Sequence, residues 1–116
     1  MIEEIDEEIV LYIDTSATEE VRVGISIGGE KDFAVKASRR EKAQVTLSLI
    51  ADLLDKHDLV PDDIDKIEVN TGPGSFTGLR VGLSIANTMG SFLEIPINNE
   101  GKGEIVLPLY GSRLIN

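Results

Sequence analysis

The stretch NTGPGSFTGLRVGL, from Asn70 to Leu83, is the most informative part of this chain. It places three glycines and one proline within residues 72–78 and then turns apolar at helical spacing. Because the segment KIEV at residues 66–69 precedes it and has the pattern of a short strand, the sequence predicts a strand, a glycine loop and a helix in succession. Three roles fit such a loop: a phosphate cradle at the helix N-terminus, a structural elbow, or a platform for a docking partner.

The spacing within this loop separates the first two roles. A Walker loop needs Gly-Lys-Ser/Thr at the start of the helix, whereas Thr-Gly-Leu stands at residues 77–79, and the glycine spacing does not match a dinucleotide loop. An elbow needs glycines that let the chain reverse and a side-chain oxygen that caps the helix. Gly72 and Gly74 meet the first need, and Ser75 or Thr77 meets the second. Spacing alone therefore favours the elbow.

The remaining patterns predict an α/β order. Gly28-Gly29 separates two alternating apolar segments and suits the positive φ angles of a tight hairpin. Ser38 and Glu41 have the spacing of a capping box at the start of a helix. The order is β-β-β-α-β-α-β, with an antiparallel hairpin and later strands that return through helical crossovers. We therefore expect a single ribonuclease-H-like domain of the actin-like ATPase (ASKHA) class, with helices on a mixed five-stranded sheet. The expected strands are residues 9–13, 21–27, 32–37, 66–69 and 95–98, and the helices begin near residues 38 and 77.

A second candidate for chemistry is the DTS segment that ends the first strand. The strand, residues 9–13, is a continuous apolar run, as expected of a strand buried on both faces. Carboxylate and hydroxyl oxygens at its end can hold a metal-bound phosphate in this fold class, although a turn that satisfies the backbone is favoured. A homodimeric nucleotide-binding protein is thus the alternative function. Its candidate site residues are Asp14, Thr15, Ser16, Gly72, Gly74 and Ser75.

The two predicted helices carry an apolar arc wider than one sheet face requires. On the second helix, small residues recur every four positions, which lets another backbone approach closely. Packing of this stripe against the first helix or the sheet is an equally good explanation. If the surplus apolar surface is exposed, it predicts self-association, most simply as a two-fold dimer. The candidate partner-interface residues are Leu49, Leu53, Val81, Gly82, Ile85, Ala86, Met89 and Gly90.

Composition excludes several classes of function. The chain has 116 residues and a formal net charge of −10, which opposes direct, strong binding to nucleic acid. It has no cysteine and one histidine, His57, so thiolate and multi-histidine metal sites are excluded, and His57 is expected to act as a cation at a helix end. No apolar run approaches the roughly 20 residues of a membrane span. We expect a cytoplasmic protein without a metal or cofactor.

Three segments, YIDTSATEEVRVGI, NTGPGSFTGLRVGLSIA and EIPIN, resemble the N-terminal domain of the TsaB (YeaZ) family. The resemblance covers about residues 9–98, and GPGSFTGLRVG is highly specific to the family. It implies an actin-like fold and a non-catalytic subunit of the bacterial machinery that makes threonylcarbamoyladenosine in tRNA. It also implies that the two helices bind the related catalytic subunit TsaD, joined by the ATPase TsaE, or form a homodimer when the protein is alone. Catalysis of the TsaD type is not expected, because its metal site needs two histidines on one helix.

The chain departs from the family in length. Members are usually about twice as long, so the resemblance implies that a second domain is missing. The end of the chain, LPLYGSRLIN, nevertheless resembles the closing Pro-x-Tyr-x-x-Arg segment of full-length members, with Pro108, Tyr110 and Arg113 at that spacing. We therefore expect an internal deletion. The predicted organisation is an acidic arm at residues 1–8, the TsaB-like domain at 9–98, and a C-terminal segment at 99–116 in place of the second domain.

Overall fold

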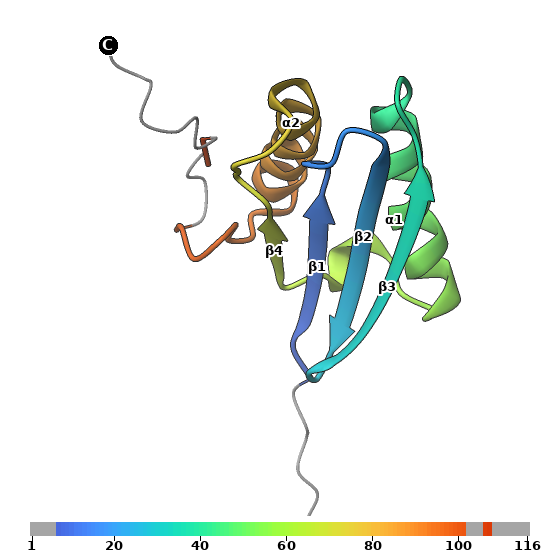
Figure 1. Cartoon of the computed structure of the whole chain (residues 1–116). Helices are drawn as coiled ribbons and strands as arrows, with labels where there is room; N and C mark the ends of the chain where they lie inside the picture. The colour runs from blue at the N-terminus through green and yellow to red at the C-terminus, as the bar shows by residue number, and fades with distance from the viewer. Residues whose placement is uncertain (1–6, 102–105, 108–116) are drawn as a thin grey trace, which may run out of the picture.

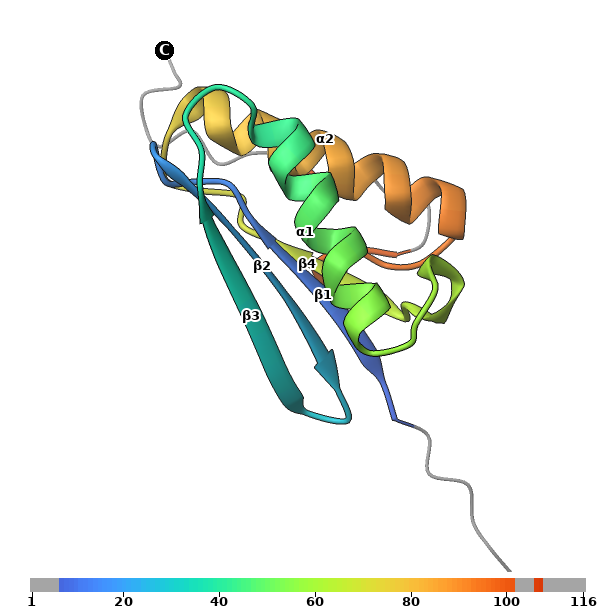
Figure 2. The same cartoon turned by 90° about the vertical axis from the view of Figure 1, so that its right-hand side faces the viewer.

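The structure is a computed structural model that describes residues 7–101 and 106–107. One sheet with strand order β3-β2-β1-β4 carries both long helices on the same face (Figures 1 and 2). Strand β2 is antiparallel to both β1 and β3, whereas β4 runs parallel to β1. The mixed α/β fold with helical crossovers is therefore confirmed. Its elements are β1 (Ile9–Asp14), β2 (Glu20–Ile27), β3 (Glu30–Ala37), α1 (Lys42–Lys56), the 3₁₀ helix η1 (Pro61–Asp63), β4 (Lys66–Val69) and α2 (Phe76–Leu93).

The hairpin between β2 and β3 forms where the two glycines predict it. Gly28 and Gly29 have φ angles of 58° and 92°. The strands pair from Ile27 with Glu30 onward, so the loop is two residues long. Positive φ at both central residues is the geometry that fits the right-handed twist of the strands, and glycine adopts it without steric cost.

The two faces of the sheet differ in what covers them. Residues paired across antiparallel strands share a face, and Leu11, Ile25 and their neighbours form the helix-facing core. Helix α1 packs mainly on β2, and α2 packs on β4 and β1. Within the residues that the structure describes, no helix covers the opposite face (Figure 2). On that open face Val10 is buried and Tyr12 is half-buried, so the expectation of a first strand buried on both faces is met only in part.

The prediction of a fifth strand at residues 95–98 is wrong: among the described residues the sheet has four strands. Ile97 makes one isolated parallel bridge to Ile67 of β4, and the ladder stops there. The Asn98 side chain replaces the next backbone pair, because its Oδ1 accepts from Val69 N at 2.7 Å and its Nδ2 donates to Val69 O at 2.8 Å. Asn98 has a φ of 50°, which turns the chain away from the sheet.

The capping box expected at Ser38 and Glu41 is also wrong. The backbone N–H of Ser38 donates to Glu19 O at 2.9 Å and so extends the hairpin, which delays the helix. Helix α1 begins at Lys42, and Glu41 at its N-cap makes no side-chain capping bond. The Ser38 hydroxyl is buried without a hydrogen-bond partner among the described residues.

Other expectations concern the chain ends. Residues 1–6 of the acidic arm, and Pro108, Tyr110 and Arg113 of the C-terminal motif, lie outside the described residues, so the predicted division of the chain stays a prediction. Val106 is described, and Asn87 of α2 holds its backbone through two hydrogen bonds of 2.9 Å.

None of the helices in the described ranges is long and apolar enough to span a membrane.

Candidate functional site

Thr15, just beyond the end of β1, fastens α2 to the sheet. Its buried hydroxyl donates to the carbonyl oxygen of Gly78 at 2.6 Å and accepts from the N–H of Gly82 at 3.0 Å. A Cβ at Gly78 would overlap the Thr15 carbonyl oxygen, and a Cβ at Gly82 would overlap the Thr15 hydroxyl. These two glycines therefore let the first turns of α2 lie directly on the end of β1.

Asp14 and Asn70 link the ends of the parallel strands β1 and β4. Asp14 Oδ1 accepts hydrogen bonds from Ser16 N at 2.9 Å, Ser16 Oγ at 2.6 Å and Asn70 Nδ2 at 3.2 Å. Asn70 Oδ1 in turn accepts from Gly72 N at 2.8 Å. Asn70 was not among the predicted site residues. Its position directly after a strand parallel to β1 is the sequence signal that could have identified it.

The glycine loop packs on this same turn. Ser75 N donates to Ser16 O at 2.8 Å, and Ser75 Oγ accepts from Gly78 N at 3.2 Å, which confirms Ser75 as the helix cap. Gly72 has a φ of 114° and precedes a cis peptide bond. Gly74 serves a different purpose, because a Cβ there would overlap Ser16.

The structure thus brings all six candidate nucleotide-binding residues to one end of the sheet. Many of their polar groups are bonded to one another or to the start of α2. A phosphate cradle needs backbone N–H groups that point at a ligand. The loop N–H groups of Gly72, Ser75 and Gly78 instead bond to oxygens of this chain. The geometry therefore favours the structural elbow.

The eight candidate interface residues divide into two groups. Leu49, Leu53 and Ala86 are buried in the core against the sheet. Gly82 and Gly90 are buried too: added Cβ atoms would meet Thr15 and Ile97 respectively. The small residues of this stripe therefore allow α2 to pack closely against other segments of the same chain. The other group, Val81, Ile85 and Met89, is half-buried and lies at the edges of two hollows between the helices.

These two hollows follow the seam between α1 and α2. The larger has a volume of about 510 Å³ and is lined almost entirely by apolar side chains of both helices and of the Val60-Pro61 turn. Several lining side chains are strongly exposed: Leu47 by 51%, Val60 by 56% and Phe92 by 83%. The second hollow, of about 480 Å³, lies nearer the N-terminal ends of the helices. We call the surface that contains both hollows the helix face.

The helix face carries little charge. Arg80 is the one charged residue within the 18 residues of α2. Among the residues that line the two hollows, Arg80 and Asp62 are the charged ones. Because 28% of the whole chain is charged, this surface stands apart from the rest.

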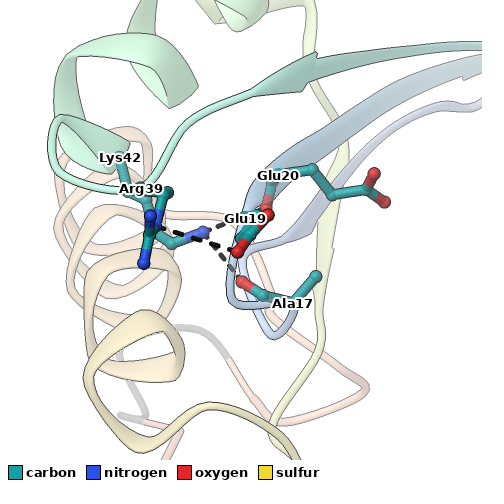
Figure 3. A network of polar contacts seen from close by, with 5 residues as sticks. All are labelled: Ala17, Glu19, Glu20, Arg39 and Lys42. Atoms are coloured by element: carbon teal, nitrogen blue, oxygen red, sulfur yellow. Dashed lines mark hydrogen bonds and ion pairs between the residues drawn. The ribbon is translucent and has the colours of Figure 1, made fainter.

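Lys42 fixes the start of α1, and the sequence patterns did not identify it. Its ammonium donates to the carbonyl oxygen of Ala17, in the turn between β1 and β2, at 2.8 Å, and to that of Glu20, at the start of β2, at 3.1 Å (Figure 3). Burial lowers the pKa of Lys42 below its ordinary value, and the Glu20 carboxylate offsets part of this effect. An exposed ion pair of 3.8 Å between Arg39 and Glu19 lies beside it.

The other end of α1 is tied to β3. Asp32 Oδ2 lies 2.9 Å from Lys56 Nζ and 2.8 Å from His57 Nε2. The hydrogen bond from Lys56 and then that from His57 lower the pKa of Asp32. His57 therefore occupies the helix end expected for it, in contact with a carboxylate.

The open face of the sheet has a different character. The Phe33 ring covers Gly24, lies 5.5 Å from the Tyr12 ring, and has the Arg22 guanidinium 4.7 Å from its centroid. Val35 is 53% exposed on the same face. Across residues 7–101 and 106–107, no group of three His, Cys, Asp or Glu side chains is placed to hold a metal ion.

Comparisons with known proteins converge on one group. The family model described as "TsaD: tRNA N6-adenosine threonylcarbamoyltransferase" matches residues 35–99, more than half of the chain. The "tRNA threonylcarbamoyladenosine biosynthesis protein TsaB" of Bacillus subtilis (strain 168) is 45% identical over 92 residues, which cover 77% of this chain and 39% of that protein. The protein of the same name from Escherichia coli (strain K12) is 34% identical over 88 residues, covering 76% and 38%.

A solved structure described as "YeaZ from Pseudomonas aeruginosa" has the same fold. It superposes with a TM-score of 0.73 at 29% identity, covering 78% of this chain and 42% of that one. The chain therefore spans about two fifths of the length of the relatives it matches.

Proposed function

The chain belongs to the TsaB (YeaZ) family, and we propose that it is a non-catalytic subunit that binds and supports a TsaD-type catalytic partner in the threonylcarbamoyladenosine modification of tRNA. It contacts this partner through the helix face. A TsaE-type ATPase joins the assembly, and the chain forms a homodimer through the same face when the catalytic partner is absent.

The names of the relatives support the pathway. Two relatives of at least 34% identity are described as tRNA threonylcarbamoyladenosine biosynthesis proteins. The matching family model carries the name of the catalytic transferase, and its range of residues 35–99 includes α1, β4 and α2. A TsaD-type protein of this family would therefore present a related pair of helices, which suits pairing about an approximate two-fold axis.

The observation that carries the proposal is the exposed, nearly uncharged helix face. Leu47, Val60 and Phe92 each expose more than half of their surface on it. In an acidic chain, a contiguous apolar patch with so little charge is typical of a surface that another protein covers.

Two features support a role without chemistry of its own. The chain has one histidine and no cysteine, so it lacks the pair of histidines that the metal site of a TsaD-type enzyme needs. The residues that could have held a nucleotide, such as Thr15 and Ser75, are engaged in fastening α2. The net charge of −10 further argues that the tRNA is held by a partner.

Binding to the TsaD-type protein of the same organism tests this function. The informative variant is Leu47→Arg, which places a charge in the larger hollow at a position that is 51% exposed. Val35→Arg is the matched control, because Val35 is 53% exposed on the opposite face of the sheet. Isothermal titration should give tight binding for the wild type and for Val35→Arg. Leu47→Arg should bind at least about tenfold more weakly, since a buried interface position tolerates an unpaired charge poorly.

Thermal unfolding of both variants checks that each remains folded. Equal binding by Leu47→Arg and the wild type would reject the helix face as the docking surface. Failure of the wild type to bind any TsaD-type protein would reject the proposed function itself.

A further inference from the structure

The open face of the sheet contains a hollow at the end where the parallel strands β1 and β4 finish (Figure 1). Its volume is about 360 Å³, within the usual range for small-molecule sites. Two aromatic rings and four polar or charged groups characterise its lining: Tyr12, Phe33, Asp14, Arg22, Glu68 and Asn70. Because both long helices cover the other face of the sheet, this hollow is separate from the helix face.

Two opposite charges line this hollow without neutralising each other. Asp14 and Arg22 are direct cross-strand partners of β1 and β2, a position at which opposite charges attract. Within the described chain they form no ion pair with each other, and the Arg22 guanidinium lies 4.7 Å from the centroid of the Phe33 ring instead. Asp14 Oδ1 accepts three hydrogen bonds from Ser16 and Asn70, whereas its Oδ2 accepts none from the described residues. A half-buried carboxylate oxygen and a guanidinium therefore remain available to a ligand.

The aromatic rings occupy the next cross-strand row. Tyr12 and Phe33 flank Gly24, their ring centroids lie 5.5 Å apart, and the Phe33 ring covers the glycine. Successive side chains on one face of a strand are two residues apart, which is about 6.6 Å along the strand. The rings therefore form an apolar floor beside Asp14 and Arg22, within reach of the side chain of one amino acid.

We propose that this hollow binds a free α-amino acid with an aromatic or large apolar side chain. The ligand's carboxylate accepts hydrogen bonds from the Arg22 guanidinium, and its ammonium donates to Asp14 Oδ2. Arginine can stack on an aromatic ring and still present its N–H groups to a carboxylate, so the contact with Phe33 holds the guanidinium in place. Bonds between charged groups of this kind are the strong ones, and the side chain of the ligand packs on the aromatic floor.

Other classes of ligand fit the hollow less well. A phosphate ester would bring negative charge beside the Asp14 and Glu68 carboxylates. A metal ion would lie beside Arg22, and the described residues contain no group of three His, Cys, Asp or Glu side chains placed to hold one. Glu68 lies 3.4 Å from Lys66, which leaves Asp14 as the carboxylate for an ammonium. A zwitterion supplies one charge of each sign and so pairs both Asp14 and Arg22.

Titration of the full chain with L-phenylalanine, followed by ¹H–¹⁵N NMR, tests this site. The backbone amides of Tyr12, Arg22 and Phe33 should shift saturably, with a dissociation constant of about 1 mM or lower. Two analogues separate the charges: phenethylamine lacks the carboxylate, and 3-phenylpropionate lacks the ammonium. Each should bind at least about tenfold more weakly than L-phenylalanine, because one of the two charged groups is then left without a partner.

Two variants assign the charges to their side chains. Asp14→Asn keeps an oxygen that can accept from Ser16 and Asn70 but removes the negative charge, and Arg22→Met keeps an apolar stem on Phe33 but removes the guanidinium. Each should weaken binding of L-phenylalanine at least about tenfold. The matched controls are Asp52→Asn and Arg40→Met, which change the same charges at exposed positions outside the hollow and should bind as the wild type does.

Three results would overturn the proposal: no saturable shift at millimolar L-phenylalanine, an analogue with one charge that binds as tightly, or undiminished binding by both variants. The analogues are measured on the wild type, so they decide the question even if a variant fails to fold. None of these results bears on the TsaD-type binding measured with Leu47→Arg, because that position lies on the other face of the sheet.

Discussion

The Thr15 hydroxyl bonds to the Gly78 carbonyl and the Gly82 amide, which are four residues apart on α2. One buried side chain at the end of a strand thereby sets both the position and the rotation of the helix. The glycines on the helix are the counterpart of this contact, since side chains there would occupy the space of Thr15. These three residues therefore help to position α2 on the sheet, alongside its apolar core side chains.

Replacing Thr15 by Val tests this role while keeping the shape of the side chain. The substitution removes the hydroxyl and leaves the Gly78 and Gly82 backbone groups without this partner in a buried site. The free energy of unfolding should fall by about 1–2 kcal/mol in urea titration. Thr15→Ser, which keeps the hydroxyl and loses a methyl group, is the matched control and should retain more stability than Thr15→Val. If the Thr15→Val variant had the same free energy of unfolding as the wild type, the hydroxyl would have no part in holding α2 on the sheet.

At the scale of elements, the sequence patterns succeed where structure is local. The hairpin follows from Gly28-Gly29, and the second helix follows from its apolar spacing and its Ser75 cap. Both depend on φ angles and hydrogen bonds between residues close in sequence, which the pattern encodes directly. The spacing of the glycine loop likewise favours an elbow, and the family resemblance supports the same interpretation.

The patterns fail where distant residues decide. The start of α1 is delayed because Ser38 pairs with Glu19, and the fifth strand ends after one bridge because the Asn98 amide occupies the edge of β4. The small-residue stripe is ambiguous for the same reason. Its spacing indicates that another segment packs closely on α2, but it does not tell whether that segment belongs to the same chain or to a partner. The sequence does not indicate the buried role of Lys42, because a lysine at a helix start is normally a solvated charge.

The tie between α1 and β3 makes a prediction about pH. Contacts with Lys56 and His57 lower the pKa of Asp32 below its ordinary value of 3.8, so the ionised form is favoured in the folded state. Its stabilising effect is present above pH 3.8 and is lost as the pH falls through the lowered pKa. The wild type should therefore melt higher than Asp32→Asn near neutral pH, and the difference should vanish in strong acid. Asp52→Asn, at an exposed position that makes no ion pair among the described residues, is the matched control for the loss of one negative charge.

At the scale of the whole molecule, charge and apolar surface are segregated. The chain is strongly acidic, with 21 Asp and Glu against 11 Lys and Arg, yet the helix face carries two charges at opposite ends. A high net charge opposes association in general, because copies repel one another at long range. Association is therefore restricted to the surface where apolar contact outweighs this repulsion. Added salt should strengthen self-association, because it screens the repulsion between copies.

The same charge predicts how the chain meets tRNA. A protein that binds nucleic acid directly releases counterions through a basic surface, so its affinity falls steeply as salt rises. This chain, at a net charge of −10, should show no saturable tRNA binding in a mobility-shift titration at physiological salt, and lowering the salt should not create it. Adding the TsaD-type partner should produce a complex that contains tRNA and both proteins, because the partner supplies the contact with the phosphates. Micromolar binding by the chain alone, weakened by salt, would instead require a basic surface and would contradict its role as a subunit that acts only through its partner.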